Sequence, residues 1–404
     1  MATGSIETAP LEPVPWRALF VLGAASFASS AALRFCDPLL PKLALAFNTT
    51  PGGAAIVVTT YAVAYGGFQL ITGPLGDRFG KVRVIALGAL LCGLFTTASA
   101  FAASLEQLAL LRFLAGLTGA AIIPNCLAFI GDTIPMPQRH AVLARYMIFM
   151  STGTVSGQAI GGVLADIFGW HAVFLMVGGF LLFGGAVLTL QMQTNPVLSA
   201  RSPPPEGGLM GSFRQIAAVR NSVTGRLVLA TVAIEAAVYF GAFTFLGAHL
   251  REAYGISYTA IGALTALSAV GAVTYSTLAP YLLSRISQSG LMLVSATLFA
   301  AGFIAFAATP ALWLVALAIV VCGAGFALFH NSLQIMATQI NPQARGASIA
   351  IFAFAFFAGQ TIGVFITSLA YDRFGASPLF ATTAVLLPLI VLWFRARVVT
   401  RFDL

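Results

Sequence analysis

The stretch Gly73-Pro-Leu-Gly-Asp-Arg-Phe-Gly-Lys-Val-Arg83 is a basic, glycine-punctuated segment between two apolar runs, residues 54–75 and 84–103. Each run approaches the roughly 20 apolar residues that a helix needs to cross a bilayer. The segment is therefore expected to be a tight loop joining two membrane helices, and its cations place it on the cytoplasmic side. Gly73 and Gly76 are expected to let the helix ends approach closely, and Asp77 to seek a cation or a helix N-terminus.

The composition indicates an integral, all-α membrane protein. Of the 404 residues, 59% are hydrophobic and 8% are charged, whereas a soluble domain carries about 25% charged residues. Pro38 and Pro41 are expected to end or kink the long first apolar run. The apolar runs predict twelve spans, at 16–46, 54–75, 84–103, 108–130, 142–165, 171–191, 224–248, 258–283, 290–309, 311–336, 346–370 and 378–396.

The net charge of +8 follows membrane topology rather than nucleic-acid binding. With the N-terminus inside, 15 Lys and Arg side chains fall on the cytoplasmic side and three outside, namely Lys42, Arg251 and Arg373. Arg34 and Arg112 lie within spans. This asymmetry is the positive-inside pattern, so both termini are expected in the cytoplasm.

No pattern of enzyme chemistry is present. The sequence contains no G-x-S-x-G, no phosphate-binding loop and no H-E-x-x-H, and its four histidines are scattered. The four cysteines lie in apolar runs without C-x-x-C spacing, so neither a disulfide framework nor a metal site is expected. We expect no enzyme and no cofactor, with the first span serving as its own insertion signal.

The chain is expected to fold as two six-helix bundles. Residues 192–222 contain Asn195-Pro196 and Arg201-Ser-Pro-Pro-Pro-Glu-Gly-Gly208, which cannot form a buried helix. The predicted division is a cytoplasmic tail, an N-terminal bundle, a cytoplasmic linker with a short amphipathic piece at 213–219, a C-terminal bundle and a cytoplasmic tail, at 1–15, 16–191, 192–222, 223–396 and 397–404.

The two bundles resemble each other. At an offset of 206, matching pairs are Gly119 and Gly325, Asn125 and Asn331, Arg139 and Arg345, and Asp166-x-Phe168-Gly169 and Asp372-x-Phe374-Gly375. At an offset of 202, Gly157-Gln158-x-Ile160-Gly161 matches Gly359-Gln360-x-Ile362-Gly363. An internal duplication with a substrate site between the halves is how many secondary transporters are built.

Charges inside the bilayer are the main candidates for function, because each costs roughly 2.5–3.5 kcal/mol on insertion scales. Arg34 and Asp37 share one face of the first span, and Asp37 is placed to pair with Arg112 of the fourth. A nearby cation and desolvation act on a buried carboxylate in opposite senses, so their balance can suit proton transfer. The alternatives are a structural ion pair and, through Arg34 and Arg112, an anionic-substrate site.

Glu235 is the deepest acid, near the middle of the seventh span, and is the first candidate for binding a proton or a substrate cation. The alternative is a protonated side chain that bonds to a neighbouring helix. Other candidates for lining a substrate cavity are Asn125, Gln158, His330, Asn331 and Gln360. His330 could titrate near neutral pH, although a histidine between apolar neighbours is often a packed hydrogen-bond donor.

The segment 73–83 resembles the loop between helices 2 and 3 of the major facilitator superfamily, with Lys81 where that family more often has arginine. The resemblance implies two bundles of six helices and a substrate cavity lined by helices 1, 4, 7 and 10. It also implies that Asp77, Lys81 and Asp132 form a charge relay that latches the halves in the outward-open state, Asp77 facing the N-terminus of helix 11. Residues of this conformational latch are Gly73, Gly76, Asp77, Arg78, Gly80, Lys81 and Asp132.

Two further motifs point to the proton-coupled members of this superfamily. Arg112-x-x-x-Gly116-x-x-Gly119 resembles a helix-4 motif whose arginine is implicated in proton transfer. Gly153-x-x-x-Gly157-Gln158-x-x-Gly161-Gly162 resembles the antiporter motif of helix 5, with Gln158 in place of its proline. That replacement weakens the antiport assignment, and helix packing alone would account for the glycines.

The resemblance implies a twelve-helix drug:proton antiporter that exports a small amphipathic compound by alternating access. We expect a monomer, and the few charges and the short linker indicate a bacterial inner membrane. A cationic compound would suit Glu235, and Asp37, Arg112 and Glu235 would couple its movement to protons. One alternative is a proton-coupled or facilitative transporter of small organic anions or sugars. Another is a receptor or lipid-handling scaffold with the transporter fold.

Overall fold

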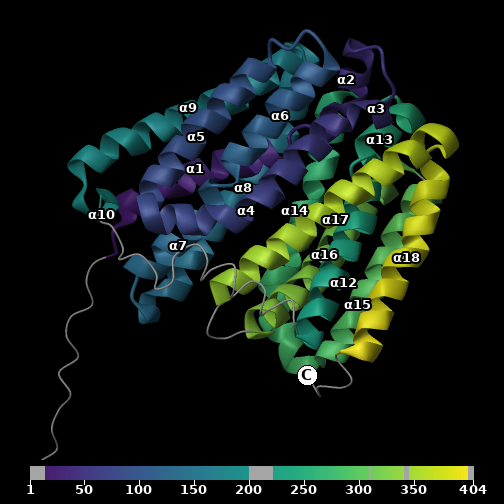
Figure 1. Cartoon of the computed structure of the whole chain (residues 1–404). Helices are drawn as coiled ribbons and strands as arrows, with labels where there is room; N and C mark the ends of the chain where they lie inside the picture. The colour runs from purple at the N-terminus through teal and green to yellow at the C-terminus, as the bar shows by residue number, and fades with distance from the viewer. Residues whose placement is uncertain (1–13, 200–221, 309–310, 341–344, 399–404) are drawn as a thin grey trace, which may run out of the picture.

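The computed structural model describes residues 14–199, 222–308, 311–340 and 345–398. Throughout this part of the chain the regular secondary structure is helical, and the helices form two groups that diverge from one end (Figure 1). The predicted all-α membrane fold is therefore confirmed. The amphipathic piece expected at 213–219 and most of both tails lie outside the described residues.

The first group of helices comes from the N-terminal half of the chain. Its elements are α1 (Trp16–Arg34), the 3-10 turn η1 (Asp37–Leu39), α2 (Leu40–Ala46), α3 (Pro51–Ala54), α4 (Ile56–Phe79), α5 (Lys81–Ser99), α6 (Leu105–Gly119), α7 (Ile122–Thr133), α8 (Met136–Ile167), α9 (Trp170–Thr194) and α10 (Pro196–Ser199).

The second group comes from the C-terminal half. Its elements are α12 (Val223–Phe243), α13 (Leu246–Tyr254), α14 (Tyr258–Arg285), α15 (Gln288–Ala308), α16 (Leu312–Ile340), α17 (Arg345–Phe374) and α18 (Ala376–Arg397). We call the end of the molecule at which α1 begins and α18 ends the near end. The far end is the one at which η1, α3 and α13 lie (Figure 1).

Eleven helical segments of the described chain are long and apolar enough to cross a membrane. The twelfth expected span corresponds to α8, which has 32 residues but a more polar sequence. Its middle part, Ser151 to Gln158, is rich in Ser, Thr and Gly, and α8 packs between α1 and α14. A helix covered by protein on two sides needs fewer lipid-facing apolar side chains. This explains why α8 is less hydrophobic than the eleven other spans.

The helices of the two halves pack in matching ways. A Cβ on Gly157 of α8 would lie 2.8 Å from Ala31 of α1, and one on Gly363 of α17 would lie 2.1 Å from the carbonyl oxygen of Ala237 of α12. Both pairs of helices therefore touch along their backbones, as small residues in membrane helices allow. The turns that follow α8 and α17 also match, because Gly169 and Gly375 both have positive φ, 86° and 79°.

The chain breaks at two places that the sequence marks. The first span divides at η1, where Pro38 prevents a regular helix. The second break is shorter than the tight loop expected at 73–83, so the predicted extent is wrong. Helix α4 continues through Pro74 to Phe79, and Gly80 alone, with φ 95°, separates it from α5. Gly73 has open space around its Cβ position, whereas a Cβ on Gly76 would lie 1.8 Å from Asn125 Oδ1.

The halves meet toward the far end. There α8 packs against α14, α4 against α17, and α13 against η1 and α2. The hydrogen bonds recorded between the halves in the described chain join Arg34 to Gln360, Asp166 to the start of α14, and Asp372 to the start of α3. The near ends of the halves diverge (Figure 1).

Candidate functional site

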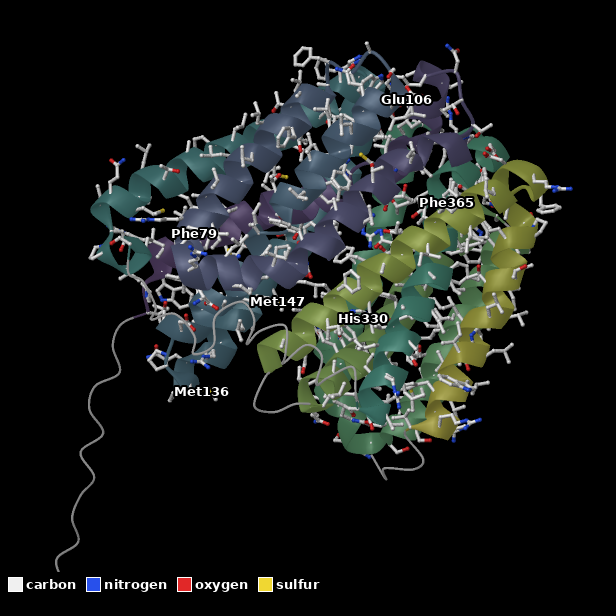
Figure 2. All side chains as sticks on the ribbon, in the orientation of Figure 1. Phe79, Glu106, Met136, Met147, His330 and Phe365 are labelled. Atoms are coloured by element: carbon white, nitrogen blue, oxygen red, sulfur yellow. The ribbon has the colours of Figure 1, made fainter. Side chains whose placement is uncertain are left out.

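Glu235 and His330 form a buried pair inside the C-terminal half. The Glu235 side chain is fully buried in α12, and its Oε2 lies 3.1 Å from His330 Nδ1 on α16. The other carboxylate oxygen has no hydrogen-bond partner among the described residues. The His330 side chain is 18% exposed, so the histidine lies between the acid and accessible space. Figure 2 places His330 about midway between the two ends of its half.

Aromatic rings surround this pair. The His330 ring is stacked on Phe326 with centroids 5.0 Å apart and has Phe356 at 5.1 Å. Tyr239, one turn after Glu235 on α12, stacks on Phe326 at 4.6 Å. Such rings provide apolar surface and a negative π-face, which suits an amphipathic cation.

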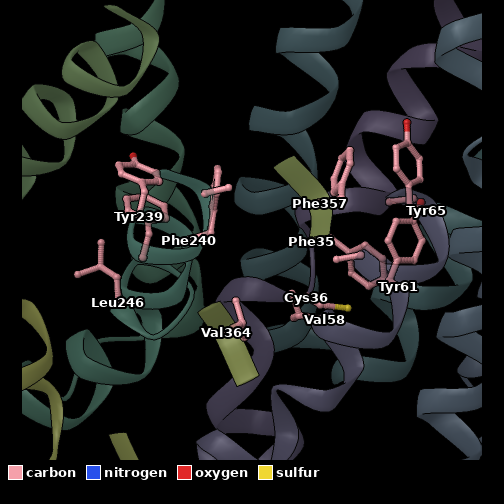
Figure 3. Close-up of a cluster of buried hydrophobic side chains, with 14 of the residues drawn as sticks. Phe35, Cys36, Val58, Tyr61, Tyr65, Tyr239, Phe240, Leu246, Phe357 and Val364 are labelled. Carbon is pink, nitrogen blue, oxygen red and sulfur yellow. The ribbon is translucent and has the colours of Figure 1, made fainter. Parts of the chain in front are cut away.

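Arg34 joins the N-terminal half to this aromatic cluster. Its guanidinium lies 3.9 Å from the Phe240 ring centroid, and its Nη2 donates to Gln360 Oε1 of α17 at 3.3 Å. Its Nη1 lies 3.6 Å from Asp37 Oδ2 without a hydrogen bond. The neighbouring Tyr239 ring has its centroid 4.9 Å from that of Phe240 (Figure 3). Helix α12 thus carries both Glu235 and the aromatic ring that Arg34 contacts.

The expected ion pair between Asp37 and Arg112 is not formed. Arg112 is 1% exposed, and it donates to the carbonyl oxygens of Val57 and Ala32 at 3.4 and 3.2 Å. Its guanidinium lies 4.0 Å from the Tyr61 ring centroid. The carbonyls and the ring hold the cation within α1, α4 and α6, although its Nη1 has no hydrogen-bond partner among the described residues.

The polar residues expected to line a cavity fall in different places. Asn125 donates to the carbonyl oxygens of Thr72 and Ala121, so its amide group binds α4 and α7 together. Gln158 is buried on α8, and its carbonyl oxygen would lie 2.4 Å from a Cβ on Gly262 of α14. Of these residues, only Gln360 contacts Arg34. Asn331 is half-buried beside His330 on α16.

The charge relay expected at the near end is present within the N-terminal half. Lys81 Nζ lies 3.0 Å from Asp77 Oδ1 and 2.5 Å from Asp132 Oδ2, which joins α4, α5 and α7. Arg78 lies 5.3 Å from the Phe79 ring. For Asp77 and Lys81, no hydrogen bond or ion pair to α17 is recorded in the described part of the chain.

At the far end, two aspartates make contacts between the halves that sequence reasoning missed. Asp166, near the end of α8, accepts from Tyr258 N at 3.2 Å, Thr259 N at 2.6 Å and Thr259 Oγ1 at 2.6 Å. Asp372, near the end of α17, accepts from Gly52 N at 3.0 Å and Thr50 Oγ1 at 2.6 Å. Each carboxylate caps the N-terminus of a helix of the other half.

A signal for these caps was present in the sequence. An acidic side chain in the last turn of its own helix is unfavourable, and here it occurs twice, 206 residues apart. The repeated Asp-x-Phe-Gly was interpreted only as a trace of duplication. Lys42 of α2 adds to the same region, because it donates to the carbonyl oxygen of Ala165 and lies 5.1 Å from the Tyr258 ring.

The motif glycines lie at close helix contacts. A Cβ on Gly116 would lie 2.3 Å from the carbonyl oxygen of Tyr61, and one on Gly119 would lie 2.9 Å from its hydroxyl. On α8, Gly153 faces Phe27 of α1, and a Cβ on Gly162 would lie 2.2 Å from the carbonyl oxygen of Tyr258 of α14. A Cβ on Gly161 would make only ordinary van der Waals contacts. In the described residues, no group of His, Cys, Asp and Glu could hold a metal ion.

These features are typical of a multi-pass membrane protein: two helical bundles, a buried ionisable pair inside one of them, and contacts between the halves toward one end. The sequence profile of the Major Facilitator Superfamily matches residues 20–249 and 227–402. The chain therefore belongs to the Major Facilitator Superfamily. Proteins of this family carry small molecules, so the chain is a transporter.

Curated relatives include proteins of different substrate range. The chain is 27% identical over 378 residues to an uncharacterized MFS-type transporter, YceJ, of Bacillus subtilis, covering 89% of each chain. It is 30% identical over 188 residues to the 4-hydroxybenzoate transporter PcaK of Pseudomonas aeruginosa, and 28% identical over 169 residues to the multi-drug resistance efflux pump PmrA of Streptococcus pneumoniae. These two matches span 46% and 41% of this chain and 41% and 42% of the relatives.

Solved structures confirm the fold. A bacterial homolog of the human lysosomal transporter Spinster, in an inward-facing and unoccupied conformation, superposes with a TM-score of 0.76 over 95% of this chain and 97% of that chain, at 16% identity. A D-xylose–proton symporter superposes with a TM-score of 0.72 over 93% and 97%, at 13% identity.

Proposed function

We propose that this transporter exports a small amphipathic cation in exchange for protons, with Glu235 as the group that binds either one. The observation that carries the proposal is the buried Glu235–His330 pair enclosed by aromatic rings. A carboxylate at this depth is costly unless it is neutralised. A proton or a cationic substrate can neutralise it, but not both at once, and this exclusion is what exchange requires.

His330 is placed to carry the proton. It is partly exposed and lies within hydrogen-bond distance of the fully buried Glu235, so a proton that enters this site would meet the imidazole before the acid. A histidine is suited to this transfer because each of its two ring nitrogens can hold a proton. Asp37 and Arg34 form a second ionisable pair, on the other half, whose carboxylate is a further candidate for proton coupling.

The contacts between the halves support alternating access. Because the far ends are joined and the near ends diverge, we infer that the pair is reached from the near end. The positive charges expected on that side favour a cytoplasmic face in a bacterial inner membrane. A substrate cation that displaces the proton at Glu235 would then be released at the far end once the far-end contacts open.

A second candidate function is transport of a small organic anion. Arg34 favours it, because this buried cation reaches across to Gln360 and holds Asp37 only at 3.6 Å. The similarity to the 4-hydroxybenzoate transporter also favours an organic anion as the substrate. Arg112 supports it less, because carbonyl oxygens and Tyr61 already enclose its guanidinium.

Proton flux in proteoliposomes with an interior pH dye tests these proposals. Under an imposed pH gradient, a panel of lipophilic cations, organic acids and sugars is added in turn to the wild type and to Glu235→Gln. We expect cations alone to drive proton movement and the variant to lose at least roughly tenfold in rate, equivalent to 1.4 kcal/mol. Asp37→Asn is run beside it to test the second carboxylate.

Glu252→Gln is the matched control, because it makes the same change on an exposed acid at the far end of the same span. It is expected to keep wild-type flux. Proton movement driven by organic acids and lost in Arg34→Gln would replace the cation proposal with the anion one. Flux that survives Glu235→Gln would contradict the role of the Glu235–His330 pair.

A further inference from the structure

A cavity lies on the surface of the N-terminal half, away from the Glu235–His330 site. It occupies about 530 Å³ between α1, α8 and α9 at the near end. Its walls include Phe20 of α1 and Phe149 of α8, whose rings meet edge to face at 5.6 Å. Phe20 is 64% exposed and Ile148 is 61% exposed. In a membrane protein such apolar exposure faces lipid, so the cavity opens toward the bilayer.

The charge at this cavity is basic. Arg17 and Arg145 both line it, and Trp16 beside them lies 4.5 Å from the Arg145 guanidinium. Among the described residues that line it, none is acidic. Arginine and tryptophan at the start of a membrane helix are typical of the interface between headgroups and hydrocarbon. The lining therefore changes from cationic at the interface to apolar deeper in the bilayer. This order matches the anionic headgroup and the acyl chains of a phospholipid.

We propose that this cavity binds an anionic phospholipid. Arg17 and Arg145 would hold the phosphate, and the first part of one acyl chain would lie along Phe20 and Phe149. Arginine suits a phosphate because its planar fork donates two hydrogen bonds at once. Basic pockets between membrane helices on the cytoplasmic side bind anionic headgroups in this way. The positive-inside pattern expected from the sequence places this end in that leaflet.

The bound lipid would connect two helices that carry candidate transport residues. Arg17 belongs to α1, which ends at Arg34, and Arg145 belongs to α8. Three turns further along α1 from the cavity mouth, Ser26 and Tyr146 already join the same helices through a hydrogen bond of 2.5 Å. A phosphate held by both arginines would extend this connection to the near end. The inference is independent of the substrate of the Glu235–His330 site.

Native mass spectrometry of the purified full chain in uncharged detergent tests the proposal. Phosphatidylglycerol and phosphatidylcholine with identical acyl chains are titrated separately. We expect phosphatidylglycerol to bind at least about tenfold more tightly, and Arg17→Gln/Arg145→Gln to weaken it by about 10- to 30-fold, as two arginines at a membrane surface contribute. Phosphatidylcholine binding should weaken less in the variant, because the choline cation offsets the charge of its phosphate.

Arg285→Gln is the matched control. Arg285 lies at the near end with an aromatic partner, 5.7 Å from the Tyr281 ring, but does not line this cavity, so phosphatidylglycerol binding should persist. Equal binding of both lipids, or tight binding in the double variant, would overturn the proposal. A third arm adds glycerol phosphate alone: if it displaces phosphatidylglycerol at comparable concentration, the cavity recognises a free phosphate compound and the lipid proposal fails. The preference of the wild type between lipids decides the case even where the variant does not fold.

Discussion

The two ends of this transporter hold their charges differently. At the near end, Asp77, Lys81 and Asp132 form an ion-pair cluster that joins helices of one half. At the far end, Asp166 and Asp372 each reach into the other half and cap the first turn of a helix. The near-end cluster organises a bundle, whereas the far-end caps connect two bundles.

The difference indicates which contacts must break during transport. Opening the far end removes both caps at once and leaves backbone N–H groups of α3 and α14 without partners. Opening the near end costs nothing comparable in the structure, because the near ends already diverge. Each cap contributes only about 0.5–2 kcal/mol, which is small enough to be reversible, and two together are large enough to bias a two-state equilibrium.

Removing both caps is expected to have the largest effect. Asp166→Ala/Asp372→Ala should destabilise the far-end-closed state by roughly 1–4 kcal/mol, because distant caps add. The shift is measured as the distance between two spin labels attached to introduced cysteines. One pair of labels replaces Leu45 and Arg373 at the far end, and a second pair, in a separate variant, replaces Phe79 and Tyr281 at the near end. The native cysteines are buried and compete little for label.

The expected result is a longer far-end distance and a shorter near-end distance. Asp166→Asn/Asp372→Asn is the graded comparison. Each aspartate accepts with both of its carboxylate oxygens, and asparagine keeps one acceptor oxygen, so this variant should shift the distances by less than the alanine variant. Distances that stay unchanged in the alanine variant would show that packing, rather than capping, closes the far end.

A close backbone contact provides the next largest effect. A Cβ on Gly262 of α14 would lie 2.4 Å from the carbonyl oxygen of Gln158 on α8, and backbone at a helix interface yields little. Gly262→Ala should therefore cost about 1–3 kcal/mol in the far-end-closed state, read with the same label pairs. Gly67→Ala is the control, because nothing lies within 4 Å of its Cβ position. An unshifted Gly262→Ala variant would mean that α8 and α14 slide apart without cost.

Much of the fold follows from local sequence. Apolar run length predicts the spans, Pro38 predicts the break of the first one, and matching glycines at offsets of 206 and 202 predict two similar halves. The extent of the turn at Gly80 was not predicted, because the second span was expected to end at residue 75, whereas α4 contains Pro74 and continues to Phe79. Membrane helices tolerate proline when neighbouring groups satisfy the freed carbonyl.

The site was predicted less completely, because its partners are distant in sequence. Glu235 and His330 were each candidates, but their pairing depends on how α12 packs beside α16. Arg112 was predicted to pair with an acid, whereas in the structure it contacts the Tyr61 ring and donates to carbonyl oxygens. Spacing within a helix predicts which residues share a face, but it cannot predict which of several neighbouring helices that face will meet.

Breaking the near-end cluster is expected to have the smallest effect. Lys81→Gln removes both ion pairs. Because the Asp132 side chain is 45% exposed, the substitution should shift the free-energy difference between the two states by no more than about 1 kcal/mol. The shift should be smaller still at high salt. Arg83→Gln, an exposed cation two residues along α5, is the control for lost charge alone. A shift in label distances larger than that of the double cap variant would contradict this order. It would mean that Lys81 has a partner in the other half when the near end closes, so the bundle-organising cluster seen here would also be a connection between bundles.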